Sequence, residues 1–165
     1  MLFVLTGPES SGKTTLVDAL ARHFDVPSVS EIARQYLSSP SYNASDLLAI
    51  ARAQRRAERH VSSGLAFADT DLQTLYLWWQ EKYGPAPLSL TRAYARQTPR
   101  YYLLCAPDLA WAPDPLRENP LDRDRLFDLY QADLDRRGLP YETITGLADK
   151  RLQRAVEAVE AALAG

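Results

Sequence analysis

The sequence predicts an α/β domain of three layers, with a five-stranded parallel sheet between two layers of helices. Two observations support this prediction. Short apolar runs recur along the chain and fit strands at residues 2–6, 28–30, 65–68, 101–105 and 141–144. Between these runs, apolar residues recur three or four apart, which is typical of one face of a helix. Because strands and helices alternate, we expect parallel strands joined by right-handed crossovers.

The expected helices are placed by apolar spacing and by their start signals. After the first strand, Leu16, Leu20 and Phe24 lie four apart. The dipeptide Ser45-Asp46 offers good capping oxygens at the start of another helix. These and the remaining patterns predict one helix directly after the first loop and others over 45–61, 71–82, 121–137 and 148–163.

One stretch, 106–120, shows no regular pattern and contains four prolines. Long irregular segments in compact domains are often lids or binding loops. The length of 165 residues suits one domain with a substantial core. We therefore expect residues 1–165 to form a single domain, with a lid or acceptor loop over 106–125.

Composition excludes several classes of function. At a formal net charge of −2, the chain offers no global positive field that could hold nucleic acid. A single cysteine, Cys105, excludes an internal disulfide and fits a reducing compartment. No apolar run is long enough to cross a bilayer, and the chain enters a strand at once, which leaves no room for a signal peptide. The sequence predicts a cytoplasmic protein without nucleic-acid or membrane partners, and it leaves the oligomeric state open.

The most specific motif is the loop that follows the first strand, Gly7-Pro8-Glu9-Ser10-Ser11-Gly12-Lys13-Thr14. It fits G-x-x-x-x-G-K-[ST], the phosphate-binding P-loop, in the strand–loop–helix context that this motif requires. Backbone N–H groups of such a loop bind phosphate oxygens at a helix N-terminus. Lys13 is expected to reach the outer phosphates of ATP, and the Thr14 hydroxyl to ligate the accompanying Mg²⁺. The predicted nucleotide contacts are Gly7, Glu9, Ser10, Ser11, Gly12, Lys13, Thr14 and Thr15. The Glu9 side chain is expected to face the acceptor or the waters of the metal, and the alternative is that it points away.

Polar residues follow the second and third strands, and ligands in such sheets gather beyond the carboxyl ends of the strands. Asp69 stands where the Walker B carboxylate stands, and is expected to hold Mg²⁺. Asp71 either caps the next helix or binds sugar hydroxyls and acts as a base, and both roles can hold at once. Glu31 is a candidate base or hydroxyl ligand and Arg34 a candidate phosphate clamp, unless the two form only a structural ion pair.

Further candidates follow the fourth strand. Trp111 lies in a polar, proline-rich loop, where it offers either a stacking face or a loop anchor. Arg117 and Arg123 could close over a transferring phosphate, which needs positive charge near its equatorial oxygens. For Arg123, a solvated helix start is an equal alternative. The loop after the fifth strand, 145–148, is placed beside the nucleotide base by analogy with this architecture.

Read together, four segments resemble one family: 7–16, 31–37, 68–72 and 111–117, which include Glu-Ser-Ser-Gly-Lys and Trp-Ala-Pro-Asp-Pro-Leu-Arg. They are similar to the ribosylnicotinamide (nicotinamide riboside) kinase domain of NadR-type proteins, in the P-loop NTPase and kinase superfamily. The resemblance spans nearly the whole chain and implies a P-loop NTPase fold. It also implies transfer of the terminal phosphoryl group of ATP to the 5′-hydroxyl of nicotinamide riboside, giving nicotinamide mononucleotide and ADP.

The resemblance implies roles for the acceptor residues as well. Trp111 would stack on the cationic pyridinium ring, with Asp108 and Asp114 beside it. Contacts to the ribose and its hydroxyls would come from Glu31, Arg34 and Asp71. During transfer, Lys13, Mg²⁺ and Arg117 would stabilise the spread negative charge.

The chain departs from the family in one respect. Proteins of that type commonly carry an adenylyltransferase domain before the kinase, whereas this chain begins at the kinase strand, so that activity is expected to be absent. Two other functions remain open from the residues. One is a kinase for another nucleoside or metabolite. The other is a regulatory module that binds ATP and hydrolyses it slowly.

Overall fold

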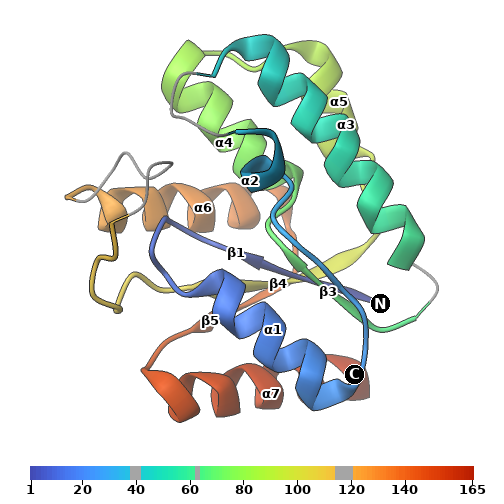
Figure 1. The fold of residues 1–165 in the computed structure, drawn as a ribbon, viewed down its shortest axis with the longest axis vertical. Coiled ribbons are helices and arrows are strands. Elements are labelled where there is room, and N and C mark those ends of the chain that lie inside the picture. The colour runs from blue at the N-terminus through green and yellow to red at the C-terminus, as the bar shows by residue number, and fades with distance from the viewer. Residues whose placement is uncertain (38–41, 62–63, 114–120) are drawn as a thin grey trace.

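The predicted sheet is present in the computed structural model, which describes residues 1–37, 42–61, 64–113 and 121–165. All strand pairs are parallel, and the spatial order is β2-β3-β1-β4-β5 (Figure 1). The strands are β1 (Leu2–Thr6), β2 (Ser28–Val29), β3 (Ala66–Asp69), β4 (Arg100–Cys105) and β5 (Tyr141–Ile144). This arrangement confirms the three-layer α/β fold expected from the alternation of apolar runs.

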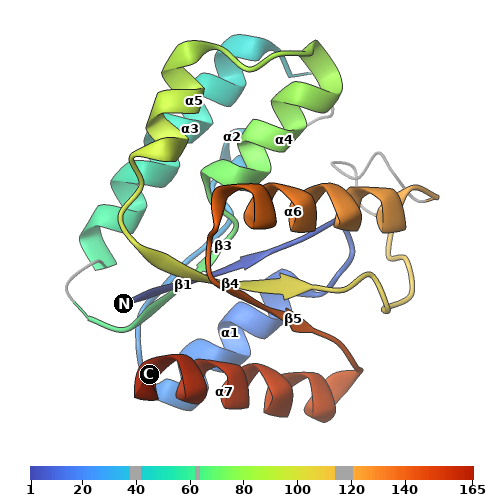
Figure 2. The same cartoon turned by 180° about the vertical axis from the view of Figure 1, so that it is seen from behind.

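Helices cover both faces of the sheet. Helices α1 (Lys13–Phe24) and α7 (Ala148–Ala164) lie on one face, and the remaining helices lie on the other (Figures 1 and 2). The second group comprises α2 (Ala33–Tyr36), α3 (Ala44–Val61), α4 (Leu72–Tyr83), α5 (Leu88–Ala95) and α6 (Arg123–Arg137). Successive side chains of a strand point to opposite faces. Accordingly Phe3 packs with α1 and α7, while its neighbours Leu2 and Val4 pack with α3, α4 and α5.

Two helices of the described structure, α2 and α5, are not in the sequence prediction. Helix α5 begins after Pro87 and buries Leu90 and Tyr94, which are four residues apart. Its eight residues are too few for a strong periodic signal. Helix α5 packs against α4 and adds these two side chains to the core on that face of the sheet.

The register of the strands brings the candidate residues to one edge. Leu5 of β1 is paired with Asp69 of β3 on one side and with Leu103 of β4 on the other. The Thr70 N–H then donates to the Leu5 carbonyl over 3.0 Å. The loop after β1 and the turn after β3 are therefore neighbours.

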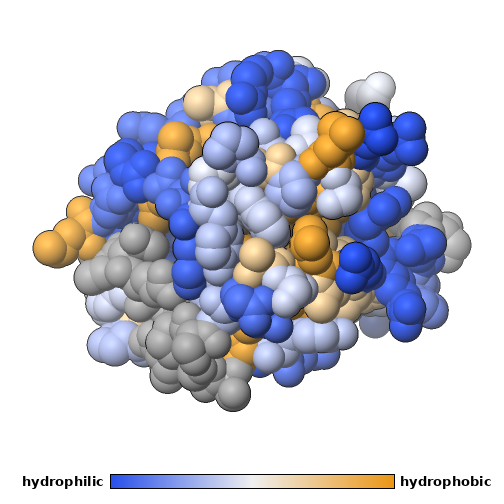
Figure 3. All heavy atoms as spheres, turned by 90° about the horizontal axis from the view of Figure 1, so that it is seen from above, coloured by the Kyte–Doolittle hydropathy of each residue, from blue (hydrophilic) through white to orange (hydrophobic). Residues whose placement is uncertain are grey.

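The outer surface is mixed in character. On the face that lies uppermost in Figure 1, hydrophobic residues are scattered among polar ones (Figure 3). Among the described helices, none is long and apolar enough to cross a membrane.

Candidate functional site

The phosphate loop needs glycine at both of its framing positions. Gly7 has φ +125° and Gly12 has φ +78°, in the left-handed region that side chains disfavour. A Cβ on Gly7 would lie 2.6 Å from the Cys105 carbonyl oxygen, and one on Gly12 would lie 2.6 Å from Leu109 Cδ1. Gly12 is the N-cap of α1 and contributes no side-chain cap. The N–H groups of the first helical turn can therefore serve an anion.

A cavity of about 100 Å³ lies over this loop, and we call it the phosphate cavity. All eight of the predicted nucleotide contacts in the loop line it: Gly7, Glu9, Ser10, Ser11, Gly12, Lys13, Thr14 and Thr15. The Lys13 ammonium folds back and donates to the carbonyls of Gly7 (2.9 Å) and Pro8 (2.7 Å). A cation is thus held at the rim of the cavity where the outer phosphates are expected.

The predicted metal residues meet directly. Thr14 Oγ1 donates to Asp69 Oδ2 over 2.5 Å, and Asp69 is 1% exposed. Its other oxygen, Oδ1, is buried and has no hydrogen-bond partner within the described residues. Burial raises the pKa of Asp69, while the nearby Lys13 charge and the Thr14 hydrogen bond lower it.

A hydroxyl beside an unsatisfied carboxylate oxygen suits Mg²⁺, a hard cation that takes oxygen ligands. Within the described residues, no three His, Cys, Asp or Glu side chains cluster as a metal site. Mg²⁺ bound by Thr14 and Asp69 would therefore need further oxygens from a bound polyphosphate and from water, which is its usual mode.

The two aspartates of the turn after β3 face different surroundings. Between them Thr70 has φ +65°, an uncommon value for a β-branched residue. Asp71 is fully buried, and its Oδ1 caps α4 by accepting from the Gln73 N–H over 2.8 Å. The capping role is confirmed. The predicted role of Asp71 as base or ribose ligand finds no support in this structure, where its carboxylate is fully buried and does not line the phosphate cavity.

A buried ionic network holds Asp71 in place. Its Oδ2 accepts from Gln97 (2.7 Å), Tyr102 (2.8 Å) and Arg100 (3.1 Å). Arg100 also donates to Glu58 of α3 over 3.0 Å. Burial raises the pKa of both Asp71 and Glu58, and the charge of Arg100 opposes this rise. The network therefore fixes the position of the turn after β3 against α3 and β4.

Glu31 and Arg34 both line the phosphate cavity, where the sequence places them. Arg34 Nε donates to Glu31 Oε2 over 2.7 Å. The Glu31 side chain is 13% exposed and the Arg34 side chain 40%. The carboxylate is therefore enclosed enough to act on a hydroxyl, and the guanidinium stays accessible to a phosphate.

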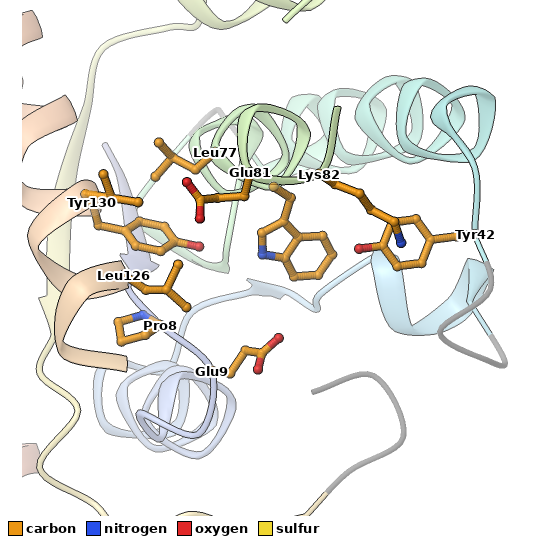
Figure 4. Close-up of a pocket in the computed structure, with 10 residues that line it drawn as sticks. Pro8, Glu9, Tyr42, Leu77, Glu81, Lys82, Leu126 and Tyr130 are labelled. Atoms are coloured by element: carbon orange, nitrogen blue, oxygen red, sulfur yellow. The ribbon is translucent and has the colours of Figure 1, made fainter. Parts of the chain in front are cut away.

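A second cavity, of about 300 Å³, adjoins the first, and we call it the aromatic cavity (Figure 4). Its walls come from the phosphate loop, from Tyr42 and from helices α4 and α6: Pro8, Glu9, Tyr42, Leu77, Trp78, Glu81, Lys82, Leu126, Leu129 and Tyr130. The Tyr42 and Trp78 rings stack with centroids 6.4 Å apart. Lys82 Nζ lies 3.6 Å from the Tyr42 ring centroid. Glu81 pairs with Arg125 over 2.5 Å.

The two cavities share three lining residues, Glu9, Trp78 and Tyr130. In Figure 4, Glu9 extends from the loop toward the space beneath the aromatic walls. Three aromatic residues of the second cavity, Tyr42, Trp78 and Tyr130, were not among the candidates predicted from the sequence. Trp78 does carry a signal, since it lies off the apolar stripe of α4 that Leu72, Leu75 and Trp79 form.

The predicted acceptor residues Asp108 and Trp111 lie outside both cavities. Asp108 instead accepts from Arg151 (2.5 Å) and from the Gly146 N–H (2.6 Å). In this structure both of its carboxylate oxygens therefore serve contacts within the chain. The Trp111 ring lies 5.8 Å from the Arg123 guanidinium carbon, which fits the loop-anchor alternative.

Arg123 supports the loop from outside the cavity. Its NH1 donates to the carbonyls of Ser10 (3.3 Å) and Leu109 (2.9 Å), and it does not line the phosphate cavity. In this structure Arg123 therefore holds the backbone of the loop from outside the cavity. Two further predicted residues, Asp114 and Arg117, lie outside the described residues.

Solved structures with the same fold include two of NadR. The chain has a TM-score of 0.77 with NadR in complex with NR and 0.73 with NadR in complex with NAD and AMP-PNP. In both cases identity is 21%, and the alignment covers 97% of this chain and 48% of NadR. The chain thus spans about half the length of NadR. Deoxyadenosine kinase from M. mycoides has a TM-score of 0.67 at 10% identity, with 98% of this chain and 100% of that chain covered.

A search of curated proteins finds no match to the sequence. A family comparison does find one. The profile of the AAA_28 family, described as an AAA domain, matches residues 2–151. This range includes the phosphate loop, Asp69 and all five strands. The chain therefore belongs to the AAA_28 family of P-loop domains.

Proposed function

We propose that this protein is an ATP-dependent small-molecule kinase that phosphorylates the 5′-hydroxyl of nicotinamide riboside, giving nicotinamide mononucleotide and ADP. One observation carries the proposal: a phosphate cavity and an aromatic cavity share the wall formed by Glu9, Trp78 and Tyr130. A polyphosphate in the first and an aromatic acceptor in the second would place donor and acceptor groups side by side. Such positioning is the main contribution of a protein to phosphoryl transfer.

On the donor side, the chain's own groups handle the negative charge. The loop N–H groups bind the phosphates, and Lys13 leaves its carbonyl partners to reach the outer ones. Thr14 and Asp69 would hold Mg²⁺, which supplies charge neutralisation on the phosphates when bound. Arg34 offers a planar, accessible fork for the transferring group.

On the acceptor side, the walls suit a flat cation. Rings of Tyr42, Trp78 and Tyr130 present faces that attract positive charge, and Lys82 already lies over one of them. Glu9 and Glu81 add two carboxylates, of which Glu81 is paired with Arg125. Nicotinamide riboside carries a cationic pyridinium ring, which Glu9 and the aromatic rings would attract once Lys82 has moved away from the Tyr42 ring. At about 300 Å³, the cavity is at the lower end of the range for small-ligand sites.

Glu31 is the residue that we assign to the acceptor hydroxyl. It is enclosed, and it lies in the phosphate cavity beside Arg34. A carboxylate there can orient the 5′-hydroxyl and accept its proton. The likeness in fold to NadR in complex with NR, and to deoxyadenosine kinase, supports a nucleoside as the acceptor.

A product assay tests the proposal. The protein is incubated with Mg²⁺ and ATP together with each of a panel of nucleosides, and ADP and phosphorylated product are followed by mass spectrometry. Nicotinamide riboside is expected to give its monophosphate at the highest rate. A faster reaction with an uncharged nucleoside would mean that this nucleoside, and not nicotinamide riboside, is the acceptor. ADP release at the same rate with and without each nucleoside would favour a regulatory ATPase.

A further inference from the structure

Arg151 is a buried cation that the proposed chemistry does not use. It lies in the first turn of α7 and is 4% exposed. A buried guanidinium is costly unless its donors are bound, so the identity of its partners shows what it holds.

The partners of Arg151 come from three separate segments at the carboxyl edge of the sheet. NH2 donates to the carbonyls of Ser11 (2.8 Å) and Ala106 (3.0 Å). NH1 donates to Asp108 Oδ1 (2.5 Å) and to the Gly146 carbonyl (3.0 Å). One side chain thus ties together the loop after β1, the segment after β4 and the loop after β5.

The bond to Ser11 bears on the orientation of the phosphate loop. In a planar trans peptide the carbonyl and the following N–H point in opposite directions, and the described residues contain no cis peptide. A guanidinium that binds the Ser11 carbonyl therefore directs the Gly12 N–H the other way. Gly12 lines the phosphate cavity, so that N–H is one of the groups available to a phosphate.

Asp108 in turn orients the guanidinium. Its Oδ1 binds Arg151, and its Oδ2 accepts from the Gly146 N–H over 2.6 Å. The pair forms a fixed link between the phosphate loop and the loop at 145–147. Neither side chain lines the phosphate cavity, so both act through the backbone that they hold.

We propose that Arg151, oriented by Asp108, is a positioning residue that keeps the Ser11–Gly12 peptide turned with its N–H toward the bound polyphosphate. The proposal rests on the nucleotide-binding half of the proposed function and is independent of the acceptor. Its effect is therefore seen in nucleotide affinity alone.

The test is calorimetric titration of Mg²⁺ and ADP into the wild-type protein, Arg151→Met and the matched control Lys150→Met. Lys150 is the exposed neighbour of Arg151 on the same helix. Arg151→Met is expected to weaken ADP binding on the order of 10- to 100-fold, as misplaced supporting groups do. The control is expected to bind as the wild type does. Arg151→Lys should fall between them, because an ammonium lacks the planar fork that reaches four acceptors.

A merely structural role would lower the melting temperature of Arg151→Met without changing the ADP affinity of the folded protein, and this result would overturn the proposal. If that variant does not fold, Asp108→Asn replaces it, with a smaller loss of affinity expected and unchanged affinity overturning the proposal. Wild-type protein that binds no ADP would sink both proposals. ADP binding without phosphorylation of any acceptor would sink only the kinase.

Discussion

The phosphate cavity and the aromatic cavity share a wall, yet they are built in different ways. Eight residues of the phosphate cavity come from one continuous stretch, 7–15. The aromatic cavity draws on the loop, Tyr42 and two helices that are far apart in the sequence. A site made from one stretch depends on local backbone geometry, whereas a site made from several elements depends on how those elements pack. The first kind is visible as a motif and the second is not.

The largest expected effect is the loss of phosphoryl transfer when the Lys13 charge in the phosphate cavity is removed. Lys13→Ala is expected to lower phosphoryl transfer on the order of 10³-fold, because the outer phosphates lose their point charge. The fold should persist, since the Lys13 ammonium donates its hydrogen bonds to oxygens of its own loop. Product formation and circular dichroism measure the two effects. A variant that keeps a tenth of the activity would contradict the assignment of the phosphate cavity.

Asp69 and Asp71, at the two ends of the turn after β3, should differ in how substitution by asparagine changes activity and stability. Asp69→Asn is expected to lower Mg²⁺-dependent activity on the order of 10²-fold. It should also raise the melting temperature of the ligand-free protein. The reason for this sign is that burial raises the pKa of Asp69, so the ionised form is unfavourable in the fold and a neutral side chain removes that cost.

At the other end, burial also raises the pKa of Asp71, but Asp71→Asn should still cost about 1–3 kcal/mol of stability, because both carboxylate oxygens accept hydrogen bonds and an amide has only one acceptor oxygen. The kinetic constants of this variant are expected to stay unchanged. Thermal unfolding and Mg²⁺ titrations of the two variants give the comparison. If Asp71→Asn lowered kcat without lowering stability, Asp71 would instead have the catalytic or ribose-binding role predicted from the sequence.

For the aromatic cavity, the informative comparison is between two tryptophans: Trp78 lines the cavity, whereas Trp111 lies against Arg123 in the loop after β4. Trp78→Leu is expected to raise the KM for the acceptor about tenfold and to leave the KM for ATP unchanged, because a stacking face for a cation is lost. Trp111→Leu should not change the KM for the acceptor, since Trp111 lines neither cavity. Steady-state kinetics with each substrate varied in turn measures both. The opposite pattern would mean that the acceptor binds at the loop over 106–113 and not in the aromatic cavity.

The smallest expected effect concerns the charge of the shared wall. Glu9→Gln should reduce the preference for a cationic acceptor over an uncharged nucleoside by about two- to fivefold, in keeping with the weak interaction of partly exposed charges. The ratio of kcat/KM for the two acceptors measures it. An unchanged ratio would mean that Glu9 faces the metal waters or points away, which are the other expectations from the sequence.

The sequence predicts the strands well because each is a short apolar run bounded by loops. Strand β1 is fully buried, as its unbroken Leu-Phe-Val-Leu run indicates. The sequence also predicts the meeting of Thr14 and Asp69, since parallel strands end at one edge of the sheet. It does not predict that Asp69 lines up with Thr14 while Asp71 joins a buried ionic network. That difference depends on Thr70 at φ +65° and on Arg100, nearly thirty residues further along the chain.

The phosphate loop can be recognised from the amino-acid sequence alone, because two glycines, a lysine and a threonine at fixed spacing specify its backbone shape. The aromatic cavity and the Arg151 link, in contrast, form only when the helices pack on the sheet. Tyr42, Trp78 and Tyr130 are brought to one wall by the packing of helices on a sheet, and Arg151 reaches Ser11 across 140 positions of sequence. Burial and long-range pairing of this kind carry no local pattern, so they appear only once the layers are in contact.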